Sequence, residues 1–482
     1  MNYKTLAHYL GLVLKMQAVV LLVPLPVALW HGENPVAAAF AWAAALCAVV
    51  GLGLGLWGRK DTNLRLRESY ILLALGWIAM CLTGALPYWF GGAAGFGNSL
   101  FESVSGFTTT GASVFGAVEE LPRGLVFWRG LSAWIGGLAM LFVLTAIAHA
   151  RWGQGGGRIL RMENSGLSWE GQRQGLRKRL RYFWGIYSSL TAAQTLLLAL
   201  GGMPLFDSLL TAMATASTGG FSVRSESLAA YGSPYIEAVT AVFMVLCGLQ
   251  YGVLFLLLAR DFAPVRQNEE LRVYAGVGLV AALLVAWNVT GTVYPHLGQA
   301  LRYGGFQVVS VLTTTGFHSG VVTDWPEFSQ IVLLLLMLVG ACGGSVGGGL
   351  KLFRVLIMGK EMRRSLLKMV QPRLIAVVKI NGRALTMDML HMTNVFILLY
   401  VLVYGVSFLL LSADTIDAAT AAGLAAACLG NVGGQYPMTS TFGGNESLSA
   451  LSKGVLMAAM LLGRLEIYPL LMLVSPRARR RL

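Results

Sequence analysis

The segment that decides the fold is FESVSGFTTTGAS, residues 101–113, in which a short apolar stretch leads into three threonines and a glycine. Similar endings occur three more times, each after another short apolar segment. A stretch of roughly 10–14 apolar residues is too short to cross a bilayer and is typical of a re-entrant or interfacial helix. The short segments are Asn98–Phe107, Pro204–Ala216, Ala300–Leu312 and Asp414–Leu429, and their endings read TTTGAS (108–113), ASTGGFS (216–222), TTTGFH (313–318) and GNVGGQY (430–436).

The composition of the whole chain is that of an integral membrane protein. Apolar residues make up 56% of the 482 residues and charged residues only 12%, whereas a typical soluble domain has roughly 25% charged residues. A soluble protein with so few charges could not cover its surface. Apolar runs long enough to cross ~30 Å of hydrocarbon predict ten membrane spans, at 6–30, 36–58, 69–90, 124–149, 182–201, 235–259, 273–294, 328–358, 388–412 and 449–474.

The spans and short segments form an internal repeat when Gly111, Gly219, Gly316 and Gly433 are aligned. Each unit has a span, a short re-entrant helix, a glycine-bearing loop and a second span. Close packing of small residues between helices also explains one such loop, but four at matching places favour a shared role. We therefore expect an all-α membrane protein with four span–pore-helix–span units around a central pore, at 63–160, 161–265, 266–372 and 373–482, after an N-terminal two-helix hairpin at 1–62.

The loops have the chemistry of a cation site. Irregular backbone at membrane depth is tolerated only where protein buries it or where it lines a water-filled cavity. Backbone carbonyls and threonine hydroxyls can replace the hydration shell of a cation, and the C-terminal end of each short helix favours positive charge. The loops contain no carboxylate, which favours K⁺ over Ca²⁺. Acidic residues nearer the outer starts of the short helices fit either helix capping or attraction of cations: Glu102, Asp207, Asp414 and Asp417.

Five segments together resemble the Trk/Ktr potassium-uptake family and its TrkH-type pore-forming subunit: FESVSGFTTTGAS, TASTGGFS, SVLTTTGFHSG, GGSVGGGLK and LLGRLEIYPLLML. The resemblance covers the whole chain, and the N-terminal hairpin fits the TrkH type rather than the shorter Ktr type. It implies potassium uptake across the plasma (inner) membrane of a bacterium, with K⁺ as the transported ion and no organic cofactor on this chain. It also implies a homodimer with one pore per subunit and a cytosolic nucleotide-binding regulatory subunit of the TrkA type.

The same resemblance assigns a K⁺ filter to the four loops. The matching residues are Thr108, Thr109, Thr110 and Gly111 in the first unit, Ser217, Thr218 and Gly219 in the second, Thr313, Thr314, Thr315 and Gly316 in the third, and Asn431, Val432 and Gly433 in the fourth. The fourth unit departs from the pattern, because Asn431 and Val432 precede its glycine where the other units carry hydroxyl side chains. A hydroxyl contact is lost there, so we expect weaker selectivity for K⁺ over Na⁺ than in a fourfold-symmetric channel.

A glycine-rich stretch interrupts the second span of the third unit. GACGGSVGGG, residues 340–349, has six glycines in ten residues, and each glycine costs a helix about 1 kcal/mol relative to alanine. In the family the equivalent stretch is an intramembrane gate beneath the filter, whereas close helix packing is the alternative explanation. The resemblance implies gating roles for Gly343, Gly344, Ser345, Gly347, Gly348 and Gly349.

Arg464 lies inside the last predicted span and is assigned to the same gate. An arginine at the centre of a membrane helix costs at least ~2.5–3.5 kcal/mol, so such residues usually face a cavity or a partner. A positive charge beneath the filter would oppose a permeating cation. The alternative is a structural ion pair with the nearby Glu466.

Other classes of function fit the sequence less well. A proton- or sodium-coupled secondary transporter is the alternative, but such folds usually contain inverted repeats, and these four units run parallel. An enzyme would need a nucleophile, a base or a metal cluster, which six dispersed histidines and five single cysteines do not provide. The net charge of +14 indicates topology rather than nucleic-acid binding, because the basic residues gather in alternate loops. We expect these loops and the RARRR tail (477–481) to contact anionic lipid or an acidic cytosolic partner.

The distribution of basic residues gives a testable topology. Both termini and the loops 59–67, 151–181, 260–272 and 359–387 should be cytoplasmic, because basic loops are retained on that side of the membrane. Single cysteines placed in each loop can be tested with a membrane-impermeant thiol reagent. An extracellular position for 151–181, which carries eight basic residues, would contradict the whole arrangement.

Overall fold

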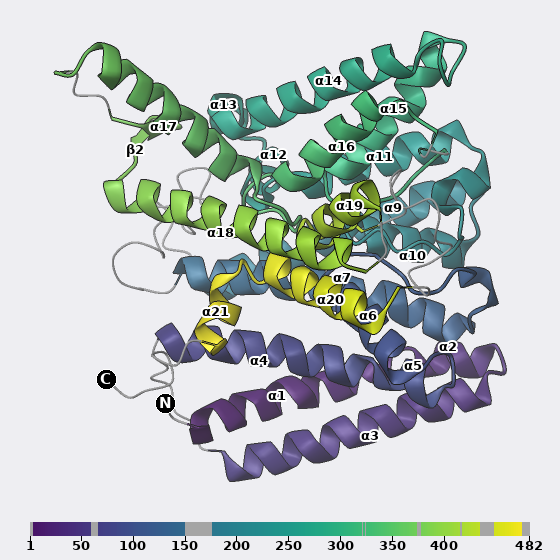
Figure 1. Ribbon diagram of the computed structural model, residues 1–482. Helices are drawn as coiled ribbons and strands as arrows, with labels where there is room; N and C mark the ends of the chain where they lie inside the picture. The colour runs from purple at the N-terminus through teal and green to yellow at the C-terminus, as the bar shows by residue number, and fades with distance from the viewer. Residues whose placement is uncertain are drawn as a thin grey trace.

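The computed structural model describes residues 3–58, 66–149, 176–320, 322, 324–373, 377–414, 417–433 and 448–474. The tail 477–481, most of the basic loops 59–67 and 151–181, and the end of the fourth predicted loop (434–436) lie outside these residues. The described chain is almost entirely α-helical (Figure 1). Its only strands form a short antiparallel pair, β1 (Lys379–Ile380) with β2 (Arg383–Ala384).

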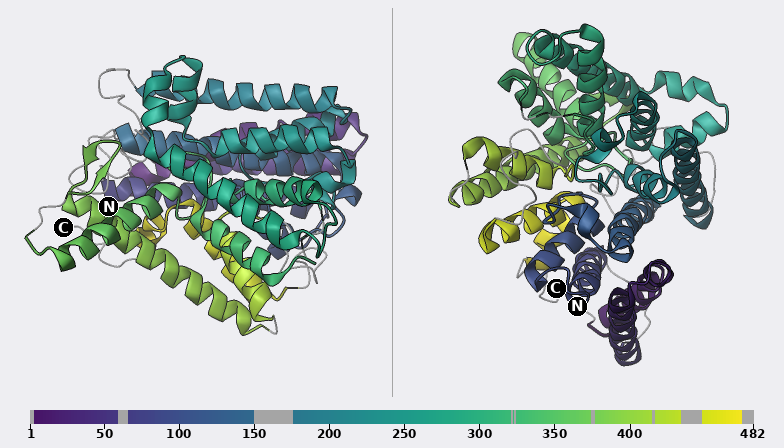
Figure 2. Two further views of the ribbon diagram at one scale, coloured as in Figure 1. Left: turned by 90° about the horizontal axis from the view of Figure 1, so that it is seen from above. Right: turned by 90° about the vertical axis from the view of Figure 1, so that its right-hand side faces the viewer.

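An N-terminal hairpin precedes the repeated part of the chain. It consists of α1 (Tyr3–Leu21), the short α2 (Leu25–Trp30) and α3 (Asn34–Trp57). Glycines let α1 and α3 approach closely, because a Cβ atom at Gly11 would lie 2.7 Å from the Gly51 carbonyl oxygen. Small residues allow this kind of helix contact within a membrane. The hairpin lies at the periphery of the molecule in the end-on view of Figure 2.

Four units follow the hairpin, and in each of them a short helix packs between the two helical segments that flank it. These short helices are α6, α10, α15 and α19, and they occur where the sequence predicts them. The bounds are α4 (Leu66–Gly84), α5 (Leu86–Phe90), α6 (Phe96–Phe107) and α7 (Arg123–His149) in the first unit; α9 (Leu176–Leu200), α10 (Leu205–Ala216), α11 (Pro234–Gly248), α12 (Tyr251–Leu258) and the connecting α13 (Phe262–Gln267) in the second; α14 (Glu269–Val289), α15 (Leu297–Leu312), α16 (Glu327–Val339) and α17 (Leu352–Val370) in the third; and α18 (Met387–Ser412), α19 (Ala418–Leu429), α20 (Ala450–Arg464) and α21 (Tyr468–Val474) in the fourth.

The four units close into a ring. The second helix of each unit also packs against the short helix of the next unit: α7 on α10, α11 on α15, α16 on α19, and α20 back on α6. The last contact joins the end of the chain to the first unit, so no unit is terminal. Seen end-on in Figure 2, the four units surround a common centre. This arrangement confirms the predicted fold class.

The spans differ from the ten unbroken segments that the sequence predicts. Among the described residues, seven helical segments are long and apolar enough to cross a membrane, and counting the pair α11–α12, which bends by 108°, as one span gives an eighth. The predicted spans 328–358 and 449–474 are not continuous helices. The first breaks at the glycine-rich stretch after α16, and the second breaks after Arg464, where Glu466 and Ile467 have φ angles of 56° and 62°.

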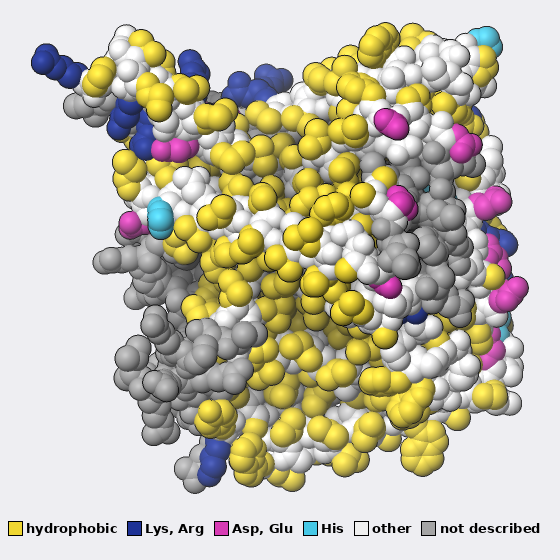
Figure 3. Space-filling view, viewed as in Figure 1, with side chains coloured by type: hydrophobic (Ala, Val, Ile, Leu, Met, Phe, Trp, Pro, Cys, Tyr) yellow, Lys and Arg dark blue, Asp and Glu magenta, His cyan; other side chains and the backbone are white. Residues whose placement is uncertain are grey.

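Charge separates the two ends of the molecule, as Figure 3 shows. Apolar side chains cover most of the face in view, lysine and arginine gather toward the end where α17 projects, and most of the aspartate and glutamate in view lie toward the opposite end. The chain starts α1 and finishes α21 at the basic end (Figure 1). The separation follows the expected pattern for a protein with one basic, cytoplasmic face. The side of the membrane that each end faces stays a prediction.

Candidate ion-conduction site

All four short helices end with the same hydrogen-bonded turn. After the last helical residue comes a cap residue, namely Thr108, Ser217, Thr313 or Gly430. Counting this cap residue as the first position, the N–H at the second position donates to the carbonyl three residues before it. The N–H at the third position donates to the carbonyl five residues before it. This is the Schellman motif, which satisfies the free carbonyls at a helix end. The chain therefore turns out of each short helix in the same direction.

The residue in the left-handed position of this motif is not glycine in any unit. Glycine is the common residue there, yet the chain carries Thr109 (φ 52°), Thr218 (φ 52°), Thr314 (φ 58°) and Asn431 (φ 50°). A β-branched residue at positive φ is strained, and strain of this kind costs roughly 1–3 kcal/mol and gathers at functional sites. Three threonines carry this strain, and Asn431, a residue type that adopts such angles more readily, takes the same conformation. A left-handed residue at this position in all four units indicates a geometry that the rest of the fold enforces.

This geometry corrects the sequence alignment of the second unit by one residue. The glycines at positive φ two positions after the strained residue are Gly111, Gly220, Gly316 and Gly433. Gly220 therefore corresponds to Gly111, whereas the sequence alignment used Gly219. Gly219 stands in register with Thr110, Thr315 and Val432, because its N–H makes the hydrogen bond of the third position. Two adjacent glycines left the register ambiguous in the sequence.

The four glycines close a ring of backbone. A Cβ atom at Gly111 would overlap the carbonyl oxygen of Gly219, and one at Gly220 would overlap that of Thr315. In the same way, Gly316 meets the carbonyl oxygen of Val432, and Gly433 meets that of Thr110. Each glycine therefore faces a third-position carbonyl of the next unit, and the fourth unit faces the first. Four carbonyl oxygens gathered in this way can coordinate a dehydrated cation.

The polar side chains around the ring are not fourfold equivalent. Thr108 Oγ1 lies 2.8 Å from Thr110 Oγ1, and Thr313 Oγ1 lies 2.9 Å from Thr315 Oγ1. The second and fourth units have no such hydroxyl pair, because glycine or valine occupies their third position. Asn431 uses its amide instead and donates 3.0 Å hydrogen bonds to Thr110 Oγ1 and to the Met460 carbonyl. The first and third units therefore resemble each other more than they resemble the other two.

A buried ion pair holds the first two loops together. Glu102 is fully buried inside α6 and accepts a 2.6 Å hydrogen bond from Arg129 Nε on α7. Glu102 also accepts from the Val114 N–H, while Arg129 donates to the Ser222 carbonyl beyond the second loop. The prediction that Glu102 caps its helix or attracts cations is wrong, because the residue lies in the middle of the helix with all its contacts inside the protein.

Two other acidic residues stand at the outer end of the fourth unit. Asp417 caps α19, and its side chain accepts a 2.9 Å hydrogen bond from the Thr420 N–H. Hydrogen bonds from the side chain and backbone of Thr420 lower the pKa of Asp417, and hydrogen bonds from Ser449 and Ser452 lower the pKa of Asp414. Both carboxylates therefore stay ionised at neutral pH. For Asp417 the capping interpretation is correct.

The glycine-rich stretch 340–349 lies directly beneath the ring. Gly348 N–H donates to Thr314 Oγ1 at 3.1 Å, and a Cβ atom at Gly348 would overlap the Gly430 carbonyl oxygen. Cys342 N–H donates to the Gly248 carbonyl, which is free because α11 ends at that residue. The stretch therefore packs between the ends of several helices, and its backbone is partnered both by its own unit, through Thr314, and by the second unit, through Gly248.

Charged side chains hold this stretch from two sides. Arg464, which is 2% exposed, donates from Nη1 to the Val346 carbonyl at 2.7 Å and from Nη2 to the Gly136 carbonyl of α7 at 3.1 Å. On the other side, Glu270 of α14 accepts a 2.6 Å hydrogen bond from the Gly343 N–H. The structure thus brings Arg464 and the glycine-rich stretch together, as the sequence analysis expects. Sequence reasoning missed Glu270, since an acidic residue at a helix start is common.

Glu466 does not pair with Arg464. Its carboxylate lies 3.2 Å from Lys351 Nζ and 2.9 Å from Arg354 Nη2, both at the start of α17. The ion-pair alternative for Arg464 is therefore wrong. The cluster joins the break after α20 to the first turn of α17, so the third and fourth units are connected immediately below the glycine-rich stretch. The sequence does indicate this cluster indirectly, because Lys351 and Arg354 lie within one helical turn of each other directly after an apolar segment.

These features define a multi-pass membrane protein built around a four-unit pore for cations. The chain belongs to the TrkH family, described as a cation transport protein, whose model matches residues 37–479. It is 32% identical to the Trk system potassium uptake protein TrkH of Escherichia coli (strain K12), over 99% of both chains. It is 30% identical to the protein TrkG of the same organism, over 98% of both. The crystal structure of the potassium transporter TrkH from Vibrio parahaemolyticus superposes with a TM-score of 0.90, at 28% identity and over the whole of both chains.

The corrected register can be tested by comparing two adjacent glycines. Gly220→Ala should lower the thermal unfolding temperature of the purified protein, because alanine at positive φ costs about 1–2 kcal/mol and its Cβ would overlap the Thr315 carbonyl. Gly219→Ala is the control, since a Cβ there meets only side chains, at 3.0 Å or more. An equal loss of stability in both variants would contradict the register.

Proposed function

We propose that this chain conducts K⁺ into the cell through the ring of four carbonyls, as the pore-forming subunit of a Trk-type uptake system in the inner membrane of a bacterium. The observation that carries the proposal is the closed set of contacts in which each filter glycine meets a third-position carbonyl of the next unit. The potassium-uptake relatives and the Vibrio potassium transporter support K⁺ as the ion.

The filter consists of the residues named from the sequence, with Gly220 added in the second unit. K⁺ sheds part of its hydration shell and binds backbone carbonyls and threonine hydroxyls in its place. The C-terminal ends of α6, α10, α15 and α19 all point at the ring, so their dipoles add to its attraction for a cation. The unequal side chains at the first and third positions support modest selectivity of K⁺ over Na⁺.

The gate consists of the glycine-rich stretch and Arg464. Gly343, Gly344, Ser345, Gly347, Gly348 and Gly349 occupy the pathway beneath the filter, and the Arg464–Val346 hydrogen bond holds them there. The charge of Arg464 adds to the barrier, since unit charges ~4 Å apart interact by ~4 kcal/mol at an effective dielectric of ~20. Conduction requires the stretch to move aside.

The structural link for this movement is α17. Lys351 and Arg354, at the start of α17, form ion pairs with Glu466. Glu466 follows Arg464 by two residues in the chain. A cytosolic regulatory subunit of the TrkA type that shifts α17 would therefore act on both ends of the gate. We further propose that the chain works as a homodimer with both termini in the cytoplasm. Membership of the Trk family supports these two statements.

The filter assignment is tested by ion preference. Gly316→Ala should reduce the ratio of Rb⁺ to Na⁺ uptake in proteoliposomes, because its Cβ would displace the Val432 carbonyl. Gly359→Ala is the control, since a Cβ at this α17 glycine has open space around it. Unchanged ion preference in alanine variants of Gly111, Gly220, Gly316 and Gly433 would show that these loops are not the filter.

The gate assignment is tested by flux without any regulatory subunit. Arg464→Gln, or deletion of residues from 343–349, should raise Rb⁺ uptake severalfold at equal protein level, because each removes the Arg464–Val346 contact. Lys453→Gln on the same helix serves as the control for charge loss, since Lys453 binds Asn98 at the other end of α20. Flux that is unaltered or lower in both variants, with normal membrane insertion, would make Arg464 a purely structural residue.

A further inference from the structure

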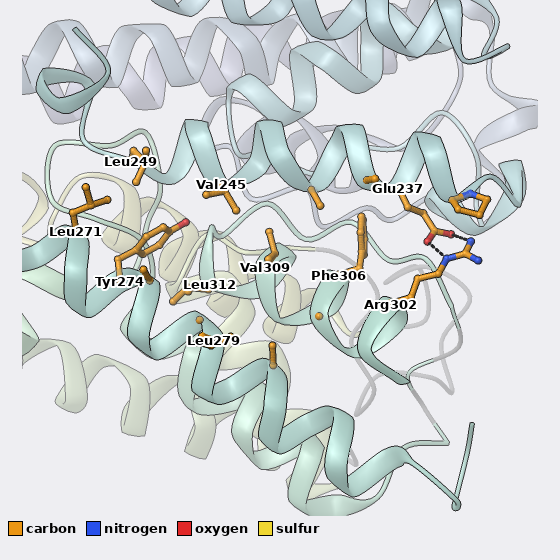
Figure 4. A pocket seen from close by; sticks show the side chains of 17 residues that line it. Glu237, Val245, Leu249, Leu271, Tyr274, Leu279, Arg302, Phe306, Val309 and Leu312 are labelled. Carbon is orange, nitrogen blue, oxygen red and sulfur yellow. Dashed lines mark hydrogen bonds and ion pairs between the residues drawn. The ribbon is translucent and has the colours of Figure 1, made fainter. Parts of the chain in front are cut away.

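A groove of about 670 Å³ lies behind the third short helix, away from the ion pathway. It is formed by α11, α14 and α15, and Figure 4 shows side chains from these three helices facing one another across it. Small residues create the space: Ala238 and Ala241 on α11, Ala275, Gly278 and Ala282 on α14, and Gly305 on α15. The groove is open along one side, and nothing in the conduction mechanism uses it.

We propose that the groove holds one acyl chain of a phospholipid from the surrounding membrane. Its walls are apolar apart from Glu237 and Arg302 at one end and the Tyr274 hydroxyl near the other, so ordered water would find few partners along its length. An empty space of this size forfeits the dispersion contacts that a packed interior makes. The outward face of α14 is exposed and apolar, with Leu279 63% and Leu283 52% exposed, and α14 is one of the membrane-crossing segments. The medium in front of the groove is therefore hydrocarbon.

The dimensions of the groove fit this occupant. Its lining begins at Pro234, and from the charged entrance at Glu237 to Leu249, directly after the end of α11, twelve residues at 1.5 Å each give a length of about 18 Å. The hydrocarbon of a bilayer is ~30 Å thick, so one leaflet contributes ~15 Å. An acyl chain that enters at the Glu237 end would therefore reach close to Leu249. In the topology proposed above this is a lipid of the outer leaflet.

A charged pair marks the entrance. Arg302 donates to Glu237 through Nε at 2.7 Å and through Nη2 at 2.8 Å (Figure 4). Arg302 Nη1 has no hydrogen-bond partner among the described residues, and the side chain is 33% exposed. Guanidinium N–H groups are well suited to phosphate oxygens. The headgroup phosphate of the lipid would therefore bind Arg302 while its chain enters the groove.

The far end of the groove lies next to the residue that precedes the third filter loop. Leu312 lines it and directly precedes Thr313, the cap residue of the third filter loop. Tyr274 also lines it (Figure 4), and a Cβ atom at Gly248 would lie 2.7 Å from the Tyr274 hydroxyl. Gly248 is the residue whose carbonyl holds Cys342 of the glycine-rich stretch. The acyl chain thus supports the back of the third short helix and the break at Gly248.

The experiment uses the full chain in bilayers that contain phosphatidylglycerol with a photoreactive diazirine near the end of one acyl chain. Mass spectrometry of the irradiated protein should find label on peptides that contain Leu249 or Tyr274. Gly305→Leu should lower this label at least tenfold, because the new side chain fills the groove. Gly276→Leu should leave it unchanged, since Gly276 is an α14 glycine with open space around it that does not line the groove.

Three results would overturn the proposal. The first is the absence of label from the groove walls in the unchanged protein, and the second is equal labelling of the Gly305→Leu and Gly276→Leu variants at matched thermal stability. The third is efficient cross-linking between two copies through a cysteine at Leu279, which would mean that protein covers the groove. The phosphate contact has its own test: the double variant Glu237→Gln/Arg302→Gln should lose groove label severalfold, and full retention would refute that contact.

Discussion

The structure depends on how closely four backbone segments approach one another in the ring. Each glycine lies where a side chain would overlap a carbonyl oxygen of the next unit, so the ring forms only if all four segments leave their helices at the same angle. The shared Schellman turn provides that angle, at the expense of left-handed Thr109, Thr218, Thr314 and Asn431. The contacts of each second helix with the next short helix hold the strained turns in place.

Beneath the ring, backbone N–H and carbonyl groups without a helical partner must be satisfied at membrane depth. Three of the four second spans break there, and each break exposes N–H and carbonyl groups that hydrocarbon cannot satisfy. Groups at one break form hydrogen bonds with groups at another, because the Cys342 N–H donates to the Gly248 carbonyl. The side chains of Arg464 and Glu270 satisfy further backbone groups of the glycine-rich stretch. The stability of this region therefore depends on a few side chains.

The sequence predicts the fold well because its repeat is strong. Four short apolar segments with similar endings were enough to place α6, α10, α15 and α19. The register of the second loop was wrong by one residue, because Gly219 and Gly220 are chemically identical in the sequence and only backbone angles distinguish them. The pairing of Glu466 with Lys351 and Arg354 was missed, since it depends on the helix break after Arg464, and the apolar residues around that break do not predict it. The contact of Arg464 with the glycine-rich stretch agrees with the sequence analysis, because an arginine in an apolar span needs a polar partner, whereas its role in gating stays a prediction.

The union of all four units in one polypeptide has an evolutionary consequence. In a channel assembled from identical subunits, every mutation in the filter appears four times, so a change that one position could tolerate must be tolerated by all. Here a mutation alters a single quarter of the ring. Glycine at the third position, Gly219, and asparagine at the left-handed position, Asn431, each occur in one unit only. One quarter of the ring can therefore change while the other three quarters keep their geometry.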